Sequence, residues 1–407
     1  MKITISHPHG NPNSFHAAQA FTEAGWLCSF QRGLTGNGII GGVTNKLPGN
    51  TGDRLRNRQL AGVPREHQRQ HLSWETISRL GKKVKPSGFS SRINWNDVLF
   101  CGHDLQVSRE LETNLDSIYA YEDAARWTFL AAKRRHAFAV YELPLGYFGG
   151  VAHEIEKARR ARPDLPVDYK TEPEWKQQRK NEELALADLI VVPCEWARSG
   201  LDFSKLTTTK VIKVPYGTPA DEVAARTHRP EGPFTVLFAG QVGMRKGVPL
   251  LLEAWKRLEL KDARLLLAGS LAFEDSYLKG YQNVEYLGPV PRTRLLEIMK
   301  SADVFVFPSL AEGFGLVIGE AMAVGVPVLT TMNTGGPELI TDDREGWCVP
   351  AHDVDALAER IAWGYTNRDI LWDMGMAARR RAEEWTWTHY RRMLVAQMTP
   401  YLNGTAH

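Results

Sequence analysis

Cysteine is scarce in this chain of 407 residues, and no long apolar run occurs in it. The four cysteines lie far apart, at Cys28, Cys101, Cys194 and Cys348. This spacing excludes the common zinc patterns and argues against a disulfide framework. The first eight residues contain no apolar signal core, and nowhere do eighteen apolar residues follow one another. We therefore expect a cytoplasmic protein, and peripheral contact with the inner face of a membrane stays open.

The chain also lacks a large excess of positive or negative charge. The formal net charge of +3 is too small to indicate a nucleic-acid partner. The exception is residues 53–96, where ten Arg and Lys face three Asp and Glu. Such a run is usually a solvated face, and the alternative is attraction of a lipid surface or an anionic acceptor.

Two patterns imitate sites but lack the context that those sites need. Residues 36–41 (GNGIIG) have the spacing G-x-G-x-x-G, yet residues 44–49 (TNKLPG) do not read as a helix. We interpret this segment as a loop, which leaves an NAD-dependent oxidoreductase without its fingerprint. Asp353 and Asp355 resemble the acidic pair of metal-dependent transferases, but they precede a helical run, so we expect Asp353 to be an N-cap and no metal to be bound.

What the chain does contain is an alternation of apolar runs and amphipathic stretches, which indicates parallel sheets with crossover helices. In the second half we expect strands at Phe234–Gly240, Ala263–Gly269, Asn283–Gly288, Asp303–Pro308 and Val326–Thr330. In the first half we expect strands at Lys2–Ser6, Asp97–Cys101, Ala137–Tyr141 and Leu189–Pro193. The fold class is α/β with two domains, as the chain length also favours.

The domain boundary is expected near Tyr216. The stretch Val211–Gly232 is rich in Pro and Gly and reads as a connector. We therefore expect a first domain over 1–215 and a second domain over 216–385. Apolar residues recur at helical spacing over Trp385–Leu402, which predicts that the segment 386–407 packs as a helix on another part of the molecule.

The strongest chemical signal is the segment from Glu312 to Glu320 (EGFGLVIGE), which follows a predicted strand directly. A glycine-interrupted turn that opens a helix presents free backbone N–H groups and the positive end of the helix dipole, so it favours an anion. Gly313 and Gly315 allow close approach of a phosphate. The Glu320 carboxylate can accept hydrogen bonds from two ribose hydroxyls, and Glu312 can bind sugar hydroxyls.

A second signal is Gly240–Gly247 (GQVGMRKG), again where a strand ends and a helix begins. Its two adjacent cations, Arg245 and Lys246, would stabilise negative charge that grows on a departing phosphate. An Arg-Lys pair alone is usually surface decoration. Together, however, the two segments point to one crevice at the carboxyl edge of one parallel sheet.

These segments, together with YLGPV at 286–290 and TGGPELI at 334–340, resemble the donor-binding half of the retaining glycosyltransferases of family four, whose fold is called GT-B. The resemblance spans about residues 234–365 and implies two Rossmann-like domains facing a cleft, the first binding the acceptor and the second the donor nucleotide. It also implies that the last helix, 386–407, packs back on the first domain. It implies that Arg245 and Lys246 hold the donor diphosphate, that Glu312 contacts the transferred sugar and that Glu320 binds the ribose. The other donor contacts that it implies are Gly240, Gly243, Val290, Gly313, Phe314, Gly315 and Leu316.

The first half resembles the family only in outline. The opening HPHGNPNSF looks like the loop that shapes the cleft, with Asn11 and Asn13 as candidate contacts. The segment 97–104 (DVLFCGHD) looks like a strand that ends in a histidine, here His103. Many members also carry a histidine at the end of the next strand, but this chain has Glu142 there. We expect Glu142, and after it His103, to contact sugar or acceptor, and the alternative is an ordinary strand-end polar group.

The function that the resemblance implies is transfer of a hexose, with retention, from a nucleotide diphosphate sugar to a saccharide or lipid-linked saccharide in glycan or polysaccharide biosynthesis. UDP-hexose is favoured as donor and GDP-mannose is second. No cofactor besides the donor is expected. A non-catalytic sugar-nucleotide sensor is the alternative, and the sequence leaves the acceptor and the oligomeric state open.

Overall fold

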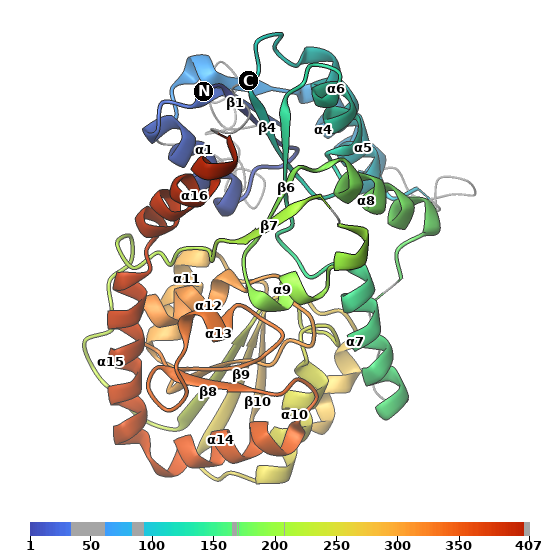
Figure 1. Ribbon diagram of the computed structural model, residues 1–407. Coiled ribbons are helices and arrows are strands. Elements are labelled where there is room, and N and C mark those ends of the chain that lie inside the picture. The colour runs from blue at the N-terminus through green and yellow to red at the C-terminus, as the bar shows by residue number, and fades with distance from the viewer. Residues whose placement is uncertain (34–61, 84–92, 165–168, 170, 207, 403–407) are drawn as a thin grey trace.

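The computed structural model describes residues 1–33, 62–83, 93–164, 169, 171–206 and 208–402 (Figure 1). Two parallel β-sheets, each covered by helices, make up two domains that lie one above the other in Figure 1. The glycine pattern at 36–41 lies outside the described residues, as do 53–61 and 84–92 of the basic segment.

The first domain has a seven-stranded sheet in the order β3-β2-β1-β4-β5-β6-β7. Its strands are β1 Ile3–His7, β2 Leu27–Arg32, β3 Gln68–Gln70, β4 Ser117–Tyr121, β5 Phe138–Glu142, β6 Leu189–Val192 and β7 Lys210–Lys213. Its helices are α1 Pro12–Glu23, α4 Leu72–Lys83, α5 Trp95–Glu110, α6 Arg126–Lys133, α7 Phe148–Ala161, α8 Glu174–Leu186 and α9 Glu195–Ser199.

The second domain has a six-stranded sheet in the order β10-β9-β8-β11-β12-β13. Its strands are β8 Phe234–Ala239, β9 Ala263–Ala268, β10 Val284–Gly288, β11 Val304–Phe307, β12 Val328–Thr331 and β13 Gly346–Val349. Its helices are α10 Val248–Leu258, α11 Arg292–Lys300, α12 Leu316–Ala323, α13 Gly336–Leu339, α14 Val354–Thr366 and α15 Arg368–Glu384.

Most predicted strands are confirmed, because a strand of a parallel sheet is buried on both faces and its sequence is a continuous apolar run. Every residue of β1, β6, β8 and β11 is buried. The strand expected at Asp97–Cys101 is wrong, since this run lies in α5, where the Asn94 side chain caps the helix by accepting from Asn96 N. A short apolar run does not distinguish a strand from a buried helix. The strand in that place is β4, and β7 occupies the start of the predicted connector.

The chain crosses between the domains twice, and the two crossings lie side by side (Figure 1). Thr218 N donates to Trp385 O at 2.8 Å, and Trp387 N donates to Thr218 O at 3.2 Å. After this crossing, helix α16 (Trp387–Leu402) returns to the first domain and packs on α1. The His16 and Trp387 rings stack there at 4.1 Å, so the last helix ties the end of the chain to its beginning.

Each sheet has one point where the strand order reverses, between β1 and β4 in the first and between β8 and β11 in the second. Ser6 pairs with Ala120 across the first point, and Leu237 pairs with Phe305 across the second. The loops that leave these neighbouring strands run in opposite directions and open a crevice at the carboxyl edge, where α/β proteins bind ligands. The fold thus provides one such crevice in each domain.

Among the described residues, no helix is both long enough and apolar enough to pass through a bilayer. Helix α4 belongs to the basic segment 53–96 and exposes two apolar side chains, Ile77 and Leu80. One of its cations, Arg79, is paired with Glu75 on the same helix at 2.7 Å.

Candidate active site

A cleft of about 790 Å³ separates the two domains at the carboxyl edges of both sheets. Ten of the residues predicted to bind donor or sugar line it: Asn11, Asn13, Gly240, Lys246, Val290, Glu312, Phe314, Gly315, Leu316 and Glu320. Five others do not: Arg245, Gly243, Gly313, His103 and Glu142. The structure therefore brings the two glycine-containing segments together, as the sequence predicted, and places some of the neighbouring residues behind the wall.

The cationic side of the cleft is built around Glu312. The Lys246 ammonium forms an ion pair with the Glu312 carboxylate, and Arg245 Nη1 lies 3.6 Å from the same carboxylate. Arg245 also donates from Nη1 to Ala311 O at 2.9 Å, which places it behind the loop. Burial and the Arg245 guanidinium lower the pKa of Lys246, while the Glu312 carboxylate favours its charged form. A diphosphate in the cleft would supply the same stabilisation.

The turn Gly313-Phe314-Gly315 opens helix α12 into the cleft. Gly315 is the N-cap of this helix with φ of 81°, a left-handed conformation that glycine adopts without strain. The cleft wall here consists of Gly315, Leu316 and Val317, that is, the first turn of the helix. Unpaired N–H groups and the helix dipole make such a turn suited to phosphate oxygens.

Glu320 lies one turn further along α12 and also lines the cleft. Its Oε1 accepts a hydrogen bond from Arg292 Nε at 2.6 Å. Arg292 is half exposed, so water competes for its side of this ion pair. Ribose hydroxyls that reach Glu320 would compete with Arg292 for a carboxylate with room for more than one donor.

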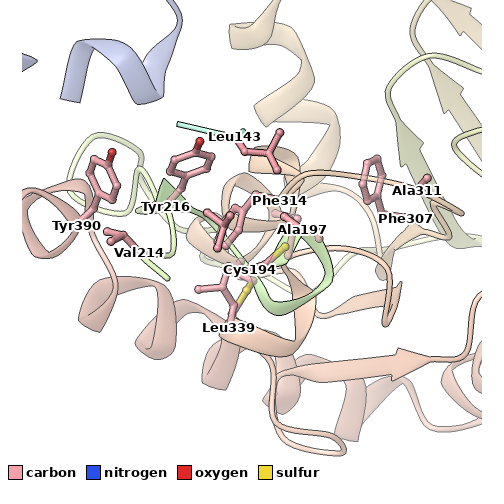
Figure 2. Packing of buried hydrophobic residues seen from close by; sticks show 14 of the residues in the cluster. Leu143, Cys194, Ala197, Val214, Tyr216, Phe307, Ala311, Phe314, Leu339 and Tyr390 are labelled. Carbon is pink, nitrogen blue, oxygen red and sulfur yellow. The ribbon is translucent and has the colours of Figure 1, made fainter. Parts of the chain in front are cut away.

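Gly313 belongs to the contact between the domains. A Cβ at this position would lie 1.8 Å from Pro144 O and 2.7 Å from Leu145 Cα, in the loop that follows β5. Gly313 O accepts from Cys194 Sγ at 2.7 Å, and the rings of Phe314 and Tyr216 meet edge to face at 5.4 Å. Figure 2 shows Cys194, Phe314, Tyr216 and Leu143 gathered at this junction. The turn Gly313-Phe314-Gly315, called the donor loop below, is therefore packed directly against the first domain.

His103 does not have the position expected of it. It lies on α5 rather than at a strand end, and it is buried away from the cleft. Its Nε2 is 3.1 Å from Ser6 Oγ, and its ring faces that of His71. Burial lowers the pKa of His103 well below that of a free histidine, so the ring is neutral. It supports β1 from behind and does not contact the cleft.

Glu142 does stand at the end of β5, but its carboxylate points beneath the cleft floor. It accepts from Tyr119 Oη at 2.5 Å, from Tyr216 Oη and from Asn13 Nδ2 at 3.2 Å. Asn13 and Tyr216 themselves line the cleft. Burial raises the pKa of Glu142, and these hydrogen bonds oppose the shift. The direct contact expected of Glu142 is thus replaced by a tie between α1, β5 and the domain linker.

Sequence reasoning missed the polar wall of the first domain. Glu122 and Asp123 follow β4 directly and line the cleft, together with His7, His9 and Phe100. The signal was present in Ser117–Tyr121 (SIYAY), a short β-prone run followed by two acids. The apolar run at 97–101 has the same appearance, and the sequence alone favours it as the strand in this place.

The acidic pair after β13 behaves as predicted. Asp353 caps α14 by accepting from Ala356 N at 2.8 Å, and Asp355 pairs with Arg257 on the surface. In the parts of the chain that the structure describes, no three His, Cys, Asp or Glu side chains are grouped to hold a metal ion.

Residues 220–381, which build the cationic and glycine-containing side of the cleft, match the model of the family described as glycosyl transferases group 1. The second domain is therefore similar to the glycosyl transferases group 1. This confirms the family resemblance. The first curated relatives are 31–38% identical, and the chain spans about two fifths of their length (36–42%).

Longer alignments come from two further relatives. The O-antigen chain mannosyltransferase B of Escherichia coli is 27% identical, over 62% of this chain and 74% of its own. The D-inositol 3-phosphate glycosyltransferase of Nocardia farcinica is 28% identical, over 61% of this chain and 59% of its own. Among solved structures, Anabaena HepE in complex with UDP and glucose superposes with a TM-score of 0.62 at 16% identity, covering 98% of this chain and all of its own. The fold is GT-B.

Proposed function

We propose that the chain is a retaining glycosyltransferase that moves a hexose from a nucleotide diphosphate sugar to a saccharide or lipid-linked saccharide in glycan or polysaccharide biosynthesis. The proposed donor is UDP-hexose, with GDP-mannose second. No cofactor or metal ion besides the donor is proposed to take part. The arrangement that carries the proposal is the Lys246–Glu312 pair beside the α12 turn, at the point where the second sheet reverses its strand order.

Three features of the described cleft support a nucleotide diphosphate sugar in particular. Lys246 and the first turn of α12 offer a cation and backbone N–H groups to a diphosphate. Glu320 offers a carboxylate to ribose hydroxyls, and Val290 and Pro289 line the cleft where a base would lie. UDP is bound by Anabaena HepE, which has the same fold, and this favours UDP among the nucleotides.

In the proposed reaction the bond between the sugar C1 and the phosphate oxygen breaks on the same face on which the acceptor hydroxyl attacks. The new bond joins C1 to the acceptor oxygen, and the acceptor proton moves to the departing phosphate oxygen. Lys246 and Arg245 stabilise the charge that grows on the diphosphate, and Glu312 orients the sugar hydroxyls. The contact of Gly313 with Pro144 keeps the two domains together, which limits the access of water to the donor.

A donor panel tests the proposal. The full chain is incubated with UDP-glucose, UDP-galactose, UDP-N-acetylglucosamine and GDP-mannose, and slow release of the nucleotide diphosphate is measured together with binding by calorimetry. We expect binding and slow hydrolysis of one donor. Binding without turnover, with or without added saccharides, would indicate the sugar-nucleotide sensor instead. Absence of binding of every donor would refute the proposed function.

A further inference from the structure

The wall of the cleft opposite the donor residues is acidic and aromatic. Glu122 and Asp123 lie where β4 ends, beside β1, at the point where the first sheet reverses its strand order. Three rings stand next to them on the same wall: those of His7, Phe100 and Tyr121. His7 meets Tyr121 edge to face at 4.7 Å. This is the ligand crevice of the first domain, and Lys246, Glu312 and Glu320 of the second domain also line the cleft.

The negative charges of this wall are compensated by lysine side chains that do not line the cleft. Lys180 Nζ lies 3.1 Å from Glu122 Oε1, and Lys176 Nζ lies 3.1 Å from Asp123 Oδ2. Both lysines are mostly buried, and neither lines the cleft. On the first-domain side, the Asp, Glu, Lys and Arg side chains that line the cleft among the described residues are these two carboxylates, and His7 and His9 line it as well.

Glu122 is more than nine-tenths buried, and its Oε1 accepts no hydrogen bond from the described residues. The Lys180 contact compensates its charge, but the geometry is unfavourable for a hydrogen bond. Burial raises the pKa of Glu122 to about 7, Lys180 opposes this, and Asp123 adds to it. Other titratable groups around Glu122 are Glu172, Tyr141, Tyr147 and Tyr169. Glu122 nevertheless lines the cleft, so hydroxyl groups that enter the cleft come close to its carboxyl group.

Carboxylates next to aromatic rings suit a polyhydroxylated ligand. Hydroxyl groups donate to carboxylate oxygens, and the apolar faces of a sugar ring pack on aromatic side chains. A phosphate or sulfate group at the same place would face two carboxylates, and no described Lys or Arg lines this side of the cleft. Such like-charge contact disfavours a charged ligand. Of the basic segment 53–96, the described residues do not line the cleft.

We infer that Glu122 and Asp123 form the acceptor subsite and select an acceptor whose reacting end is an uncharged, polyhydroxylated saccharide or polyol rather than a phosphorylated one. The inference rests on the proposed function and names the substrate class of the same cleft. The basic segment alone would favour the opposite, namely an acceptor that is selected for its negative charge.

Matched acceptor pairs test the inference. With UDP-glucose, or whichever donor the panel selects, nucleotide release above basal hydrolysis is measured with myo-inositol against inositol 1-phosphate. The same is done with methyl α-D-glucoside, methyl α-D-mannoside and maltose against glucose 6-phosphate and mannose 6-phosphate. We expect acceleration by at least one uncharged compound, at least tenfold greater than by its phosphorylated partner.

Two variants separate this subsite from the donor site. Asp123→Asn keeps the shape and the left-handed backbone of this residue, whose φ is 71° and which asparagine tolerates. Glu122→Gln removes the other charge. Each should raise the acceptor KM about tenfold or more, because one charge-assisted hydrogen bond to the acceptor is lost. Both should leave donor hydrolysis and donor binding unchanged. Asp116→Asn, at the opposite end of β4 and on the surface, is the control and should change neither.

Preference for the phosphorylated partner, or no acceleration by any uncharged compound, would overturn the inference even if donor hydrolysis is normal. Unchanged acceptor KM in both variants would do the same. Loss of donor hydrolysis in the wild-type chain would instead count against the proposed function. Thermal unfolding of both variants is followed in parallel, and Asp123→Asn decides the matter if Glu122→Gln does not fold.

Discussion

Gly313→Ala is the substitution whose effect the structure predicts most directly. Gly313 lies in the donor loop, and an added Cβ would meet two backbone atoms of the first domain, Pro144 O at 1.8 Å and Leu145 Cα at 2.7 Å. Backbone atoms cannot rotate away as a flexible side chain can. The methyl group therefore has to move the donor loop away from the loop that follows β5.

The size of this movement follows from the distances. Non-bonded heavy atoms rest at about 3.5 Å or more from one another, so the two loops must separate by roughly 1.5 Å. A misplacement of about 1 Å between reacting groups lowers a rate on the order of 10²-fold. We expect kcat to fall by about that factor, while the fold of each domain is kept, because the clash lies between the domains.

Initial rates of transfer and donor binding by calorimetry measure the two effects separately. Donor affinity should change less than kcat, since Lys246, Glu320 and the α12 turn all belong to the second domain and can move together with the loop. Gly149→Ala is the matched control: Gly149 lies in α7, and its Cβ would meet nothing within 4 Å. A kcat of Gly313→Ala within about twofold of the wild-type value would refute the contact between the domains as a catalytic requirement.

Three further predictions concern charges in and below the cleft. Lys246→Met should lower kcat by roughly 10²- to 10³-fold, the effect of removing one group that stabilises developing charge, and near-normal initial rates would exclude this role. Glu142→Gln should lower the free energy of unfolding by about 1–3 kcal/mol, since donors around a buried acceptor lose their partner, and denaturant titration measures this. It should also lower kcat more than it changes the donor Kd, because the hydroxyl of Tyr216 and the amide of Asn13 lose the group that positions them. The acceptor KM should fall as the pH rises through about 7, because the Glu122 carboxyl then becomes a carboxylate and a stronger acceptor; a profile of KM against pH that is the same in Glu122→Gln would contradict this.

The donor side of the cleft could be predicted because its determinants are local in sequence. The segments 240–247 and 312–320 each contain a strand end, a glycine turn and a helix start, so backbone geometry and chemistry are encoded in fewer than ten residues. The prediction brought Lys246, Glu312 and Glu320 to one cleft, and the structure confirms that all three line it.

The acceptor side could not be predicted in the same way. His103 looked like a strand-end histidine because the run at 97–101 is apolar, and only tertiary packing decides that this run is part of α5. Glu142 was correctly placed at the end of β5, but whether its carboxylate enters the cleft depends on Tyr119, Tyr216 and Asn13, which come from three other parts of the chain. Contacts with partners so far away in the chain cannot be predicted from the residues next to Glu142.

The sequence by itself determined the α/β class, the parallel strands of the second domain and the two glycine-containing segments that we propose bind a diphosphate, since apolar periodicity and turn residues act over short distances. The tertiary structure decided which strand of the first domain stands next to β1, and thereby that Glu122 and Asp123 face the donor residues across the cleft. It also decided that Gly313 touches the first domain. The physical reason is that strand order and domain contact are set by burial of whole faces, to which many distant residues contribute together.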